Sequence, residues 1–225
     1  MIGIISDVHG NYPALMAVLA KLEDAGCERI ISLGDVSGYY CMVNECIQEF
    51  RKRGIVNIMG NHDSYIVNNG RCNRSRTVNE CLDYQRKILK EENVKWLMQS
   101  VDYIKENDIW MVHGGWNDYV DEYVDDYSFL DNPNSEIKLY ISGHTHVQKF
   151  VKGKYARYFN PGGVGQPRDH ISTAAYALVD ENRNVILERT EYDIHRIFFE
   201  MKKAGFDERV SSCLYQGVKI GGDGK

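Results

Sequence analysis

The sequence predicts one α/β domain, because two patterns point to the same architecture. Strand-like apolar runs alternate with helical runs over residues 2–59, which is the order of a sheet whose parallel strands are joined by helices. In addition, five short apolar runs each stop at a residue type that binds metals. The carboxyl ends of strands in such a sheet share one edge, so these residues are expected along one rim. They are Asp7, Asp35, Asn61, His113 and His144.

The elements of the first half follow from their periodicity. Residues 2–6 predict a strand, and the run from Pro13 predicts a helix, with apolar residues at helical spacing and Gly26 as its stop. We expect a second strand at 29–33, a second helix at 41–54 and a third strand at 55–59. Residues 76–100 then predict two helices with no strand between them. We therefore expect a helical insert at about 64–100, over one end of the sheet.

The second half begins with an acidic segment. Residues 114–136 are rich in aromatic residues and hold seven acidic residues with no Lys or Arg, which predicts an irregular loop that could act as a lid. Beyond it, β-type runs predict strands at 147–151, 155–159, 173–179 and 184–191, followed by an amphipathic helix at about 194–204. The end of the chain, residues 217–225, is rich in Gly and is expected to fray.

Composition excludes several classes of function. Hydrophobic residues make up 43% and charged residues 26% of the 225 residues, as in globular proteins, and no apolar run is long enough to span a membrane. The N-terminus lacks the features of a signal peptide, so we expect a cytoplasmic protein. A net charge of −5 disfavours general nucleic-acid binding, which depends on cations. The six cysteines show no CxxC spacing, which favours free thiols over disulfides or zinc.

The histidines give the strongest indication of function. Five of the seven lie at or beside the predicted strand ends. Taken singly, an Asp-x-His or Gly-Asp after a strand is usually a surface turn, and an Asn or Asp there is usually a helix cap. Their joint occurrence favours a metal site instead. Nitrogen and oxygen ligands without thiolate favour Mn, Fe, Co, Ni or Zn over Ca or Mg.

The inventory of ligands suits two divalent ions. A carboxylate can bridge two ions that lie about 3.5–4 Å apart, and we choose Asp35 for this bridge. The remaining ligands divide into one set for the first ion, Asp7, His9 and His146, and one for the second, Asn61, His113 and His144. Mn is our first choice of metal, with Fe, Ni, Co or Zn as alternatives.

The motifs and their order carry a resemblance. They are Asp7-x-His9, Gly34-Asp35, Gly60-Asn61-His62-Asp63, His113 and Gly143-His144-x-His146. In this order they resemble the calcineurin-like metallophosphoesterase superfamily. The stretches DVHGN at 7–11, GDVSGY at 34–39 and NPGGVGQPRD at 160–169 are similar to those of small bacterial and archaeal phosphodiesterases related to diadenosine tetraphosphatases.

The resemblance implies a two-sheet β-sandwich flanked by helices, with a dinuclear metal site at the carboxyl ends of the strands. It implies the same seven ligands. It also adds a role for His62, which would contact the substrate phosphate and protonate the leaving oxygen, and for Asp63, which would orient His62. The hydrolysis would use a hydroxide that bridges the two ions.

The choice between phosphodiesters and phosphomonoesters rests on missing arginines. Phosphoprotein phosphatases of this superfamily carry an Asp-Arg pair after Gly-Asp and an Arg before Gly-Asn-His, whereas this chain has Val36-Ser37 and Met59 there. A monoester dianion needs more positive charge than a diester monoanion. We therefore predict a phosphodiesterase acting on a nucleotide or another small phosphodiester. The alternatives are a phosphomonoesterase or Ser/Thr phosphoprotein phosphatase, and a non-catalytic metal-binding scaffold.

Some residues are candidates for substrate contact with open alternatives. Arg168 either reaches a substrate phosphate or pairs with a carboxylate such as Asp169. Tyr39 or Tyr40 is expected to line the pocket. Gly163 stands where relatives often have Ser, so the loop lacks a hydroxyl there.

Three further groups of residues each have two alternative roles. The arginines at 71, 74 and 76 either bind a second phosphate or form a solvated basic face. The aromatic residues at 116, 119, 123 and 127 either stack on a base or pack within a lid or a subunit interface. His170 and His195 are assigned to the surface or the core.

Overall fold

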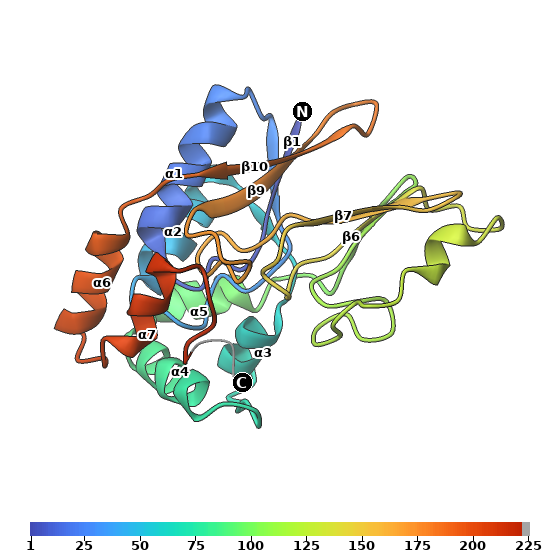
Figure 1. The fold of residues 1–225 in the computed structure, drawn as a ribbon. Coiled ribbons are helices and arrows are strands. Elements are labelled where there is room, and N and C mark those ends of the chain that lie inside the picture. The colour runs from blue at the N-terminus through green and yellow to red at the C-terminus, as the bar shows by residue number, and fades with distance from the viewer. Residues whose placement is uncertain (222–225) are drawn as a thin grey trace.

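A computed structural model describes residues 1–221 of the chain. The predicted two-sheet sandwich flanked by helices is confirmed, since two five-stranded sheets lie against each other with helices outside them (Figure 1). The first sheet has the strand order β10-β9-β1-β2-β3, and the second has the order β4-β5-β6-β8-β7. Ile4, Ile31 and Ala177 of the first sheet share a buried cluster with Leu139 and Phe159 of the second. This cluster is the core between the sheets.

The bounds of the elements are as follows. The strands are β1 (Ile2–Ile5), β2 (Arg29–Ser32), β3 (Val56–Asn57), β4 (Ile104–Glu106), β5 (Ile109–Met111), β6 (Leu139–Ile141), β7 (Lys149–Lys152), β8 (Arg157–Asn160), β9 (Ala174–Val179) and β10 (Val185–Thr190). The helices are α1 (Tyr12–Asp24), α2 (Val43–Arg53), α3 (Asn61–Val67), α4 (Arg76–Ile88), α5 (Glu91–Leu97), α6 (Ile194–Lys203) and α7 (Arg209–Ser212), with short 3₁₀ turns η1 (Ser128–Asp131) and η2 (Cys213–Tyr215).

The direction of the strands decides where the site forms. In the first sheet, β1, β2 and β3 are parallel, so their carboxyl ends meet at one edge. In the second sheet, β5, β6 and β8 are parallel. The loops that carry Asp7, Asp35 and Asn61 leave the first sheet, and those that carry His113 and His144 leave the second. The rim predicted from the sequence is thus shared by both sheets.

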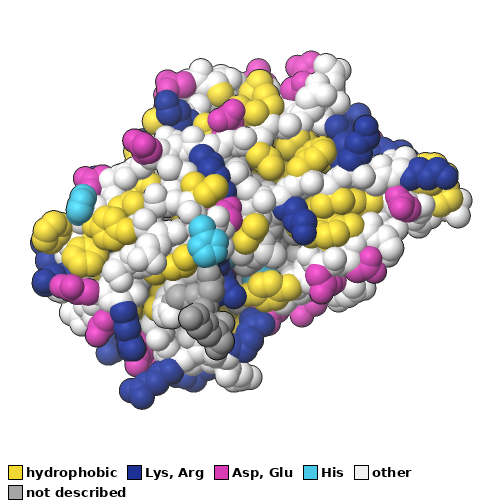
Figure 2. All heavy atoms as spheres, viewed as in Figure 1, with side chains coloured by type: hydrophobic (Ala, Val, Ile, Leu, Met, Phe, Trp, Pro, Cys, Tyr) yellow, Lys and Arg dark blue, Asp and Glu magenta, His cyan; other side chains and the backbone are white. Residues whose placement is uncertain are grey.

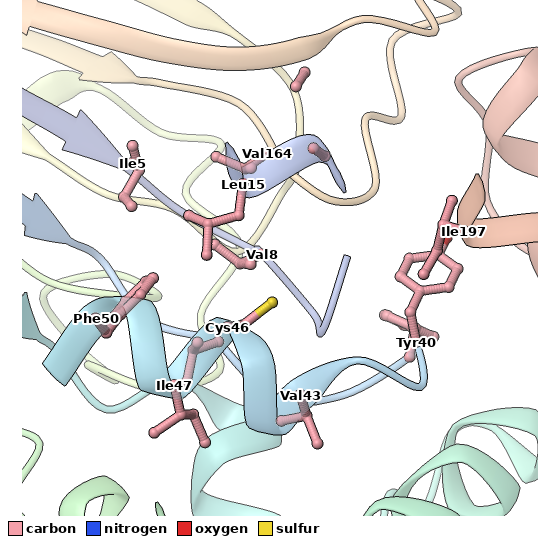
Figure 3. Close-up of a cluster of buried hydrophobic side chains, with 14 of the residues drawn as sticks. Ile5, Val8, Leu15, Tyr40, Val43, Cys46, Ile47, Phe50, Val164 and Ile197 are labelled. Carbon is pink, nitrogen blue, oxygen red and sulfur yellow. The ribbon is translucent and has the colours of Figure 1, made fainter. Parts of the chain in front are cut away.

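A second core holds the helices against the first sheet. It contains Leu15 and Leu19 of α1 and Ile47 and Phe50 of α2, all fully buried. Figure 3 shows part of this cluster, where side chains from β1, α1, α2 and α6 converge. Burying an aliphatic side chain of this size contributes roughly 1.5–3 kcal/mol, so this layer is a rigid support for the loops at the sheet edge.

Local signals fix the ends of the helices. The Asn11 side chain accepts a hydrogen bond from the Ala14 backbone N–H at 3.3 Å and caps α1, and Pro13 occupies its first turn. Gly54 ends α2 in the left-handed conformation, with φ of 64°. The Ser75 hydroxyl caps α4. These are the boundaries that Pro, Gly and Ser indicate in the sequence.

The structure differs from the expected elements in three places. The third strand is only two residues long, because the chain bends at Gly60 into α3 and Ile58 makes an isolated bridge to Val101. Strand β4 and helix α7 were not predicted. Within the end that was expected to fray, Gly217 and Val218 are buried, whereas Lys219 and Gly221 are exposed. Residues 222–225 of this end lie outside the described part of the chain.

Two findings bear on the expectations from composition. All six cysteines are free thiols, as predicted. Among the helices of residues 1–221, none has the length and apolar character that crossing a membrane requires.

Candidate metal centre and active site

The two sheets bring all seven predicted ligands and His62 to one place. Six of the ligands and His62 form three overlapping groups in which the donor atoms lie within 4.8 Å of one another; the groups are Asp7-His9-His146, His9-Asp35-His62 and Asp35-His113-His144. Asn61 joins them through a contact of 3.3 Å between its Oδ1 and His113 Nε2. None of these eight side chains is more than 5% exposed. The residues come from loops that follow β1, β2, β3, β5 and β6. Segments as distant in the sequence as those of Asp7 and His146 therefore meet at the rim.

The first group consists of Asp7, His9 and His146. His9 Nε2 lies 3.2 Å from His146 Nε2, and His146 Nε2 lies 3.3 Å from Asp7 Oδ1. Donor atoms that surround one ion at about 2.1 Å are themselves roughly 3–3.5 Å apart. The spacing of this group therefore fits a single divalent ion.

The second group is built around His113. Its Nε2 lies 3.4 Å from Asp35 Oδ2 and 3.3 Å from Asn61 Oδ1, and His144 completes the group. The same Asp35 oxygen lies 3.7 Å from His9 Nε2 of the first group. Asp35 is thus the carboxylate between the two groups, which is the position that a bridging ligand needs.

Several buried donor atoms lack a hydrogen bond. Asp7 Oδ1, Asp35 Oδ2 and His144 Nε2 are buried without a hydrogen-bond partner among residues 1–221. Leaving a buried polar atom unpaired costs roughly 1–3 kcal/mol, and three such atoms at one point are unusual in a folded protein. Metal ligation would satisfy each of them. The residues present therefore fit two divalent ions.

The histidine rings are held so that Nε2 faces the site. His9 Nδ1 donates to the Ser37 carbonyl at 2.8 Å, and His113 Nδ1 donates to the Leu33 carbonyl at 2.8 Å. His146 Nδ1 donates to the Gln166 carbonyl at 2.6 Å. A carbonyl only accepts, so each Nδ1 carries the proton and each Nε2 presents its lone pair.

The backbone of the ligand loops is strained. Positive φ angles between 52° and 65° occur at Asp7, His9, Asp35, His144 and His146. This left-handed conformation costs residues other than Gly about 1–3 kcal/mol each and persists only where the surroundings impose it. Gly60 is required for close approach, because a Cβ there would lie 2.1 Å from Asp35 Oδ1. The fold thus holds the backbone in an unfavourable conformation at these residues, and this orients their side chains toward the site.

Burial and charge set the protonation of the site. Burial would raise the pKa of Asp35, but the imidazoles of His113 and His62 hold that pKa far below its usual range. Burial lowers the pKa of His62 to about 4 and that of His144 to about 2. Burial also opposes charge on His113, yet the Asp35 carboxylate raises the pKa of His113 to about 9. Metal binding would therefore release a proton from His113.

Asp63 supports the Asp35 loop. Its carboxylate accepts hydrogen bonds from the backbone N–H groups of Asp35 and Ser37, both at 2.9 Å, and from the Asn57 amide at 3.1 Å. Within the described residues no hydrogen bond joins it to His62, whose Nδ1 has no partner. Any influence of Asp63 on His62 is therefore through the backbone of α3, which carries both residues.

A pocket of about 290 Å³ opens beside the metal ligands. His62, Tyr39 and Arg168 line it together with Asp35, Asn61, His144 and His146. The Arg168 guanidinium donates to the Tyr39 hydroxyl at 3.0 Å and to the Gln166 side chain. The alternative pairing with Asp169 is wrong, because Asp169 pairs with Arg189. Tyr40 is fully buried and bonds to Gln166 instead of lining the pocket.

Gly163 has a steric reason for being Gly. A Cβ at this position would lie 2.9 Å from the Gln166 carbonyl oxygen and 3.2 Å from the His146 Cβ. A side chain there would press on the loop that holds the His146 ring. The missing hydroxyl is thus a consequence of tight packing.

The structure distinguishes between the alternatives left open for the other arginines, aromatic residues and histidines. Of the three arginines, only Arg74 lines the pocket, whereas Arg71 pairs with Asp83 and Arg76 with Glu80. Of the four aromatic residues, only Tyr123 lines the pocket, with its ring centroid 4.2 Å from that of His144. Trp116 and Tyr127 pack in a separate cluster around Leu130, Tyr140 and Tyr158, and Tyr119 packs on Tyr103 and Trp110. His195 is exposed and bonds to Tyr215, and His170 is also exposed.

Sequence reasoning missed three residues at the site. Gln85 of α4 accepts from the Gly38 N–H at 2.8 Å and donates to the Tyr40 carbonyl at 2.7 Å, so it holds the loop after Asp35. Asp121 Oδ1 lies 3.5 Å from His144 Nε2. Lys219 lines the pocket from the end of the chain. Each comes from a segment whose pattern shows only a helix face, an acidic loop or a tail.

Comparison with known proteins gives consistent matches. The sequence model described as the calcineurin-like phosphoesterase superfamily domain matches residues 1–184. An uncharacterised protein of Methanocaldococcus jannaschii is 30% identical, with 96% of this chain and 98% of that protein covered. The crystal structure of a metallophosphoesterase from Sphaerobacter thermophilus is also 30% identical, covers 96% of this chain and 99% of its own, and has a TM-score of 0.84.

Two further structures share the fold. A hypothetical protein from Pyrococcus horikoshii is 25% identical, with 97% of this chain and 100% of its own covered and a TM-score of 0.82. A putative diadenosine tetraphosphatase has a TM-score of 0.57 at 11% identity, over 84% of this chain and 93% of its own, which shows likeness of fold alone.

Proposed function

The chain belongs to the calcineurin-like phosphoesterase superfamily, and on this basis we propose that it is a phosphodiesterase that needs two divalent metal ions, with Mn²⁺ as the first choice. The observation that carries the proposal is the set of buried, unpaired donor atoms on Asp7, Asp35 and His144, directly beside a pocket lined by His62. A scaffold without catalysis has no need of an imidazole between its metal ligands and an open pocket.

Different residues of the chain would have different roles in hydrolysis. Bound divalent ions would supply Lewis acidity, activating a water molecule and neutralising charge on the phosphate. His62 lies at the pocket wall with its ring centroid 4.8 Å from that of His9, so its imidazole can meet the leaving oxygen of a phosphate held at the metal ligands. Arg168, fixed by Tyr39 and Gln166, would bind a phosphoryl oxygen. Asp63 would keep the Asp35 loop in place.

The charge at the metal ligands favours a diester. The loop from Val36 to Tyr39 and the residue before Gly60 contribute no cation. Arg168 hydrogen-bonds to neutral side chains, whereas the charge of Arg74 is paired with Asp121. A diester carries one negative charge on its scissile phosphate, whereas a monoester near neutral pH carries close to two. One guanidinium without a carboxylate partner among residues 1–221 suits the lower charge.

Hydrolysis of two model compounds tests the proposal. The protein would be stripped of metal, restored with Mn²⁺ and supplied with bis-p-nitrophenyl phosphate or p-nitrophenyl phosphate. We expect kcat/KM for the diester to exceed that for the monoester by about 10-fold or more, a difference of about 1.4 kcal/mol, and both activities to vanish without metal. A preference for the monoester would instead identify a phosphomonoesterase, and cleavage of neither compound by metal-loaded protein would favour the scaffold.

Removing the Arg168 guanidinium should weaken binding of the scissile phosphate. A charge-assisted hydrogen bond of this kind contributes about 1.5–3 kcal/mol, so Arg168→Gln should lower kcat/KM for the diester roughly 10- to 100-fold. Tyr39→Phe removes only the hydroxyl that accepts from Arg168 and should cost less, about 2- to 5-fold. Metal content measured by elemental analysis should stay at the wild-type level in both variants. A loss of bound metal would show instead that Arg168 supports the ligand loops.

A further inference from the structure

The pocket holds further cations besides Arg168. Its lining includes Arg74 and Lys219, and Asp35 is the carboxylate in the same lining. Asp35 belongs to the metal-ligand groups, and Asp121 is the partner of Arg74. In a chain with a net charge of −5, this gathering of cations needs an explanation. Figure 2 shows Lys and Arg side chains over the helical insert at the lower edge of the molecule.

Arg74 is placed within reach of the metal ligands. Asp121 Oδ1 lies 2.5 Å from Arg74 Nη2 and 3.5 Å from His144 Nε2, so one carboxylate oxygen spans the arginine and a candidate ligand. The side chains of Arg74 and Asp121 are 52% and 35% exposed, and an ion pair with this much exposure contributes little free energy. An incoming phosphate could therefore take the place of Asp121 as the partner of Arg74.

Lys219 is brought to the pocket by a well-anchored turn. Gly217 adopts a φ of 62°, and its carbonyl accepts a hydrogen bond from the His170 N–H at 2.9 Å. A Cβ at Gly217 would lie 2.4 Å from the Ile171 carbonyl oxygen. The next residue, Val218, is buried, whereas Lys219 is exposed and is one of the residues that line the pocket. The turn at Gly217 therefore holds Lys219 at the pocket.

The pocket lining also has apolar members. They are Cys72, Val78 and Ile220, and the ring of Tyr123 joins them. An organic group fits such a lining by burial and aromatic contact. A ligand that fills the pocket therefore has a phosphate at the metal ligands, an organic part, and an anionic group within reach of Arg74 and Lys219.

We propose that the substrate carries a second phosphate group, which is not the one hydrolysed, and that Arg74 and Lys219 bind it. This inference rests on the proposed function for the scissile phosphate. It makes the substrate class a phosphodiester whose organic group bears a further phosphate, such as a nucleoside bisphosphate ester.

The test compares two ligands that differ by one phosphate. Binding of thymidine 3′,5′-bisphosphate and of thymidine 5′-monophosphate would be measured by calorimetry on the Mn²⁺-restored protein. We expect the bisphosphate to bind about 10-fold more tightly or better. Arg74→Gln and Lys219→Gln should each reduce this ratio about 3- to 10-fold, and the double variant should bring it close to one. Asp121→Asn should raise the ratio, because it removes the competing partner of Arg74.

A matched control and a second readout complete the design. Arg76→Gln removes an exposed arginine two residues from Arg74 that pairs with Glu80, and it should leave the ratio unchanged. Gly217→Ala should lower the ratio although Lys219 is retained, because it displaces the turn. The same ratio would be measured as kcat/KM for thymidine 5′-(p-nitrophenyl phosphate) with and without a 3′-phosphate.

The outcomes separate this inference from the proposed function. Equal affinity for the two nucleotides, no measurable affinity for either, or an unchanged ratio in the double variant would overturn the second phosphate site. Absence of hydrolysis with a preserved binding ratio would overturn the phosphodiesterase and keep the site. Hydrolysis of bis-p-nitrophenyl phosphate with no preference between the thymidine compounds would overturn the second phosphate site and keep the phosphodiesterase.

Discussion

The variant Asp35→Asn is expected to lose the ability to hold two divalent ions and to hydrolyse phosphodiesters at least about 1000-fold more slowly. Asp35 is the carboxylate shared by the two ligand groups, with Oδ2 3.7 Å from His9 Nε2 and 3.4 Å from His113 Nε2. An amide keeps the shape but loses the negative charge, and with its oxygen accepting from the His62 N–H it turns an NH₂ group, which cannot bind a metal ion, toward the two ligand groups. The loss of one ion removes half of the charge that stabilises the transition state.

Asn is the appropriate replacement because of the backbone. Asp35 has a φ of 57°, a conformation that Asn tolerates better than Ala does. Its Oδ1 accepts from the His62 N–H at 2.9 Å, and an amide oxygen can keep this bond. The variant should therefore fold, with a metal-free melting temperature close to that of the wild type. Asp102→Asn, at an exposed position between α5 and β4, is the matched control and should retain both ions.

Metal content and thermal stability are the measurements. After dialysis against Mn²⁺ and removal of excess, wild-type protein should hold two ions per chain and the Asp35 variant fewer. Ligand binding stabilises by RT ln(1 + [L]/Kd), which is about 2.7 kcal/mol at a 100-fold excess over Kd, so the rise in melting temperature with Mn²⁺ should also shrink. Two tightly bound ions in the variant would contradict the bridging role of Asp35.

The sheet that carries the site could be predicted because its strands follow simple rules. β1 is an Ile-rich run that stops at the polar pair Ser6-Asp7, and parallel pairing with β2 places the ends of both strands at one edge. β4 could not be predicted, since Ile104–Glu106 is short and has a single apolar residue, and it becomes a strand by pairing with β5. Strand assignment at this length depends on the partner, which the local sequence does not reveal.

The candidate ligands were found by position and residue type, but their geometry was not. No sequence pattern indicates that Asp7 or His144 adopts a left-handed backbone, since this strain is imposed by distant loops. For example, the His144 N–H donates to Asp7 Oδ2 across 137 residues of sequence. The partners of Asp63 are equally hidden, because its neighbour in sequence, His62, is not its neighbour in hydrogen bonding.

Residues that border the pocket were the hardest to predict. Lys219 lies in a Gly-rich tail that reads as frayed, and only the contact of Gly217 with the segment at 170–171 brings it to the site. Asp121 is one of seven acidic residues in its loop, and nothing in the sequence separates it from the others. Such residues reach the pocket through tertiary contacts between loops. Neither hydrophobic periodicity nor the spacing of motifs in the sequence indicates these contacts.

The variant His62→Asn is expected to keep both metal ions and to lose turnover by an amount that depends on the leaving group. His62 lines the pocket, and its ring lies in one group of potential ligands with His9 and Asp35. Because the two ligand sets proposed for the ions are complete without His62, elemental analysis should find the wild-type metal content. General acid catalysis contributes about 10²- to 10⁴-fold. An alkoxide leaves poorly without a proton, so a diester with an alkyl leaving group should show the whole of this loss. p-Nitrophenolate is stable as an anion, so bis-p-nitrophenyl phosphate should lose only about 10-fold.

The dependence on the leaving group separates proton donation from a structural role. A variant that merely misplaces the phosphate would slow both esters by the same factor, and that result would remove His62 as the acid. The exposed His195→Asn is the control and should slow neither ester. Burial lowers the pKa of His62 to about 4, which favours the neutral ring near pH 7. A phosphate anion beside the ring would favour the protonated form that a general acid needs.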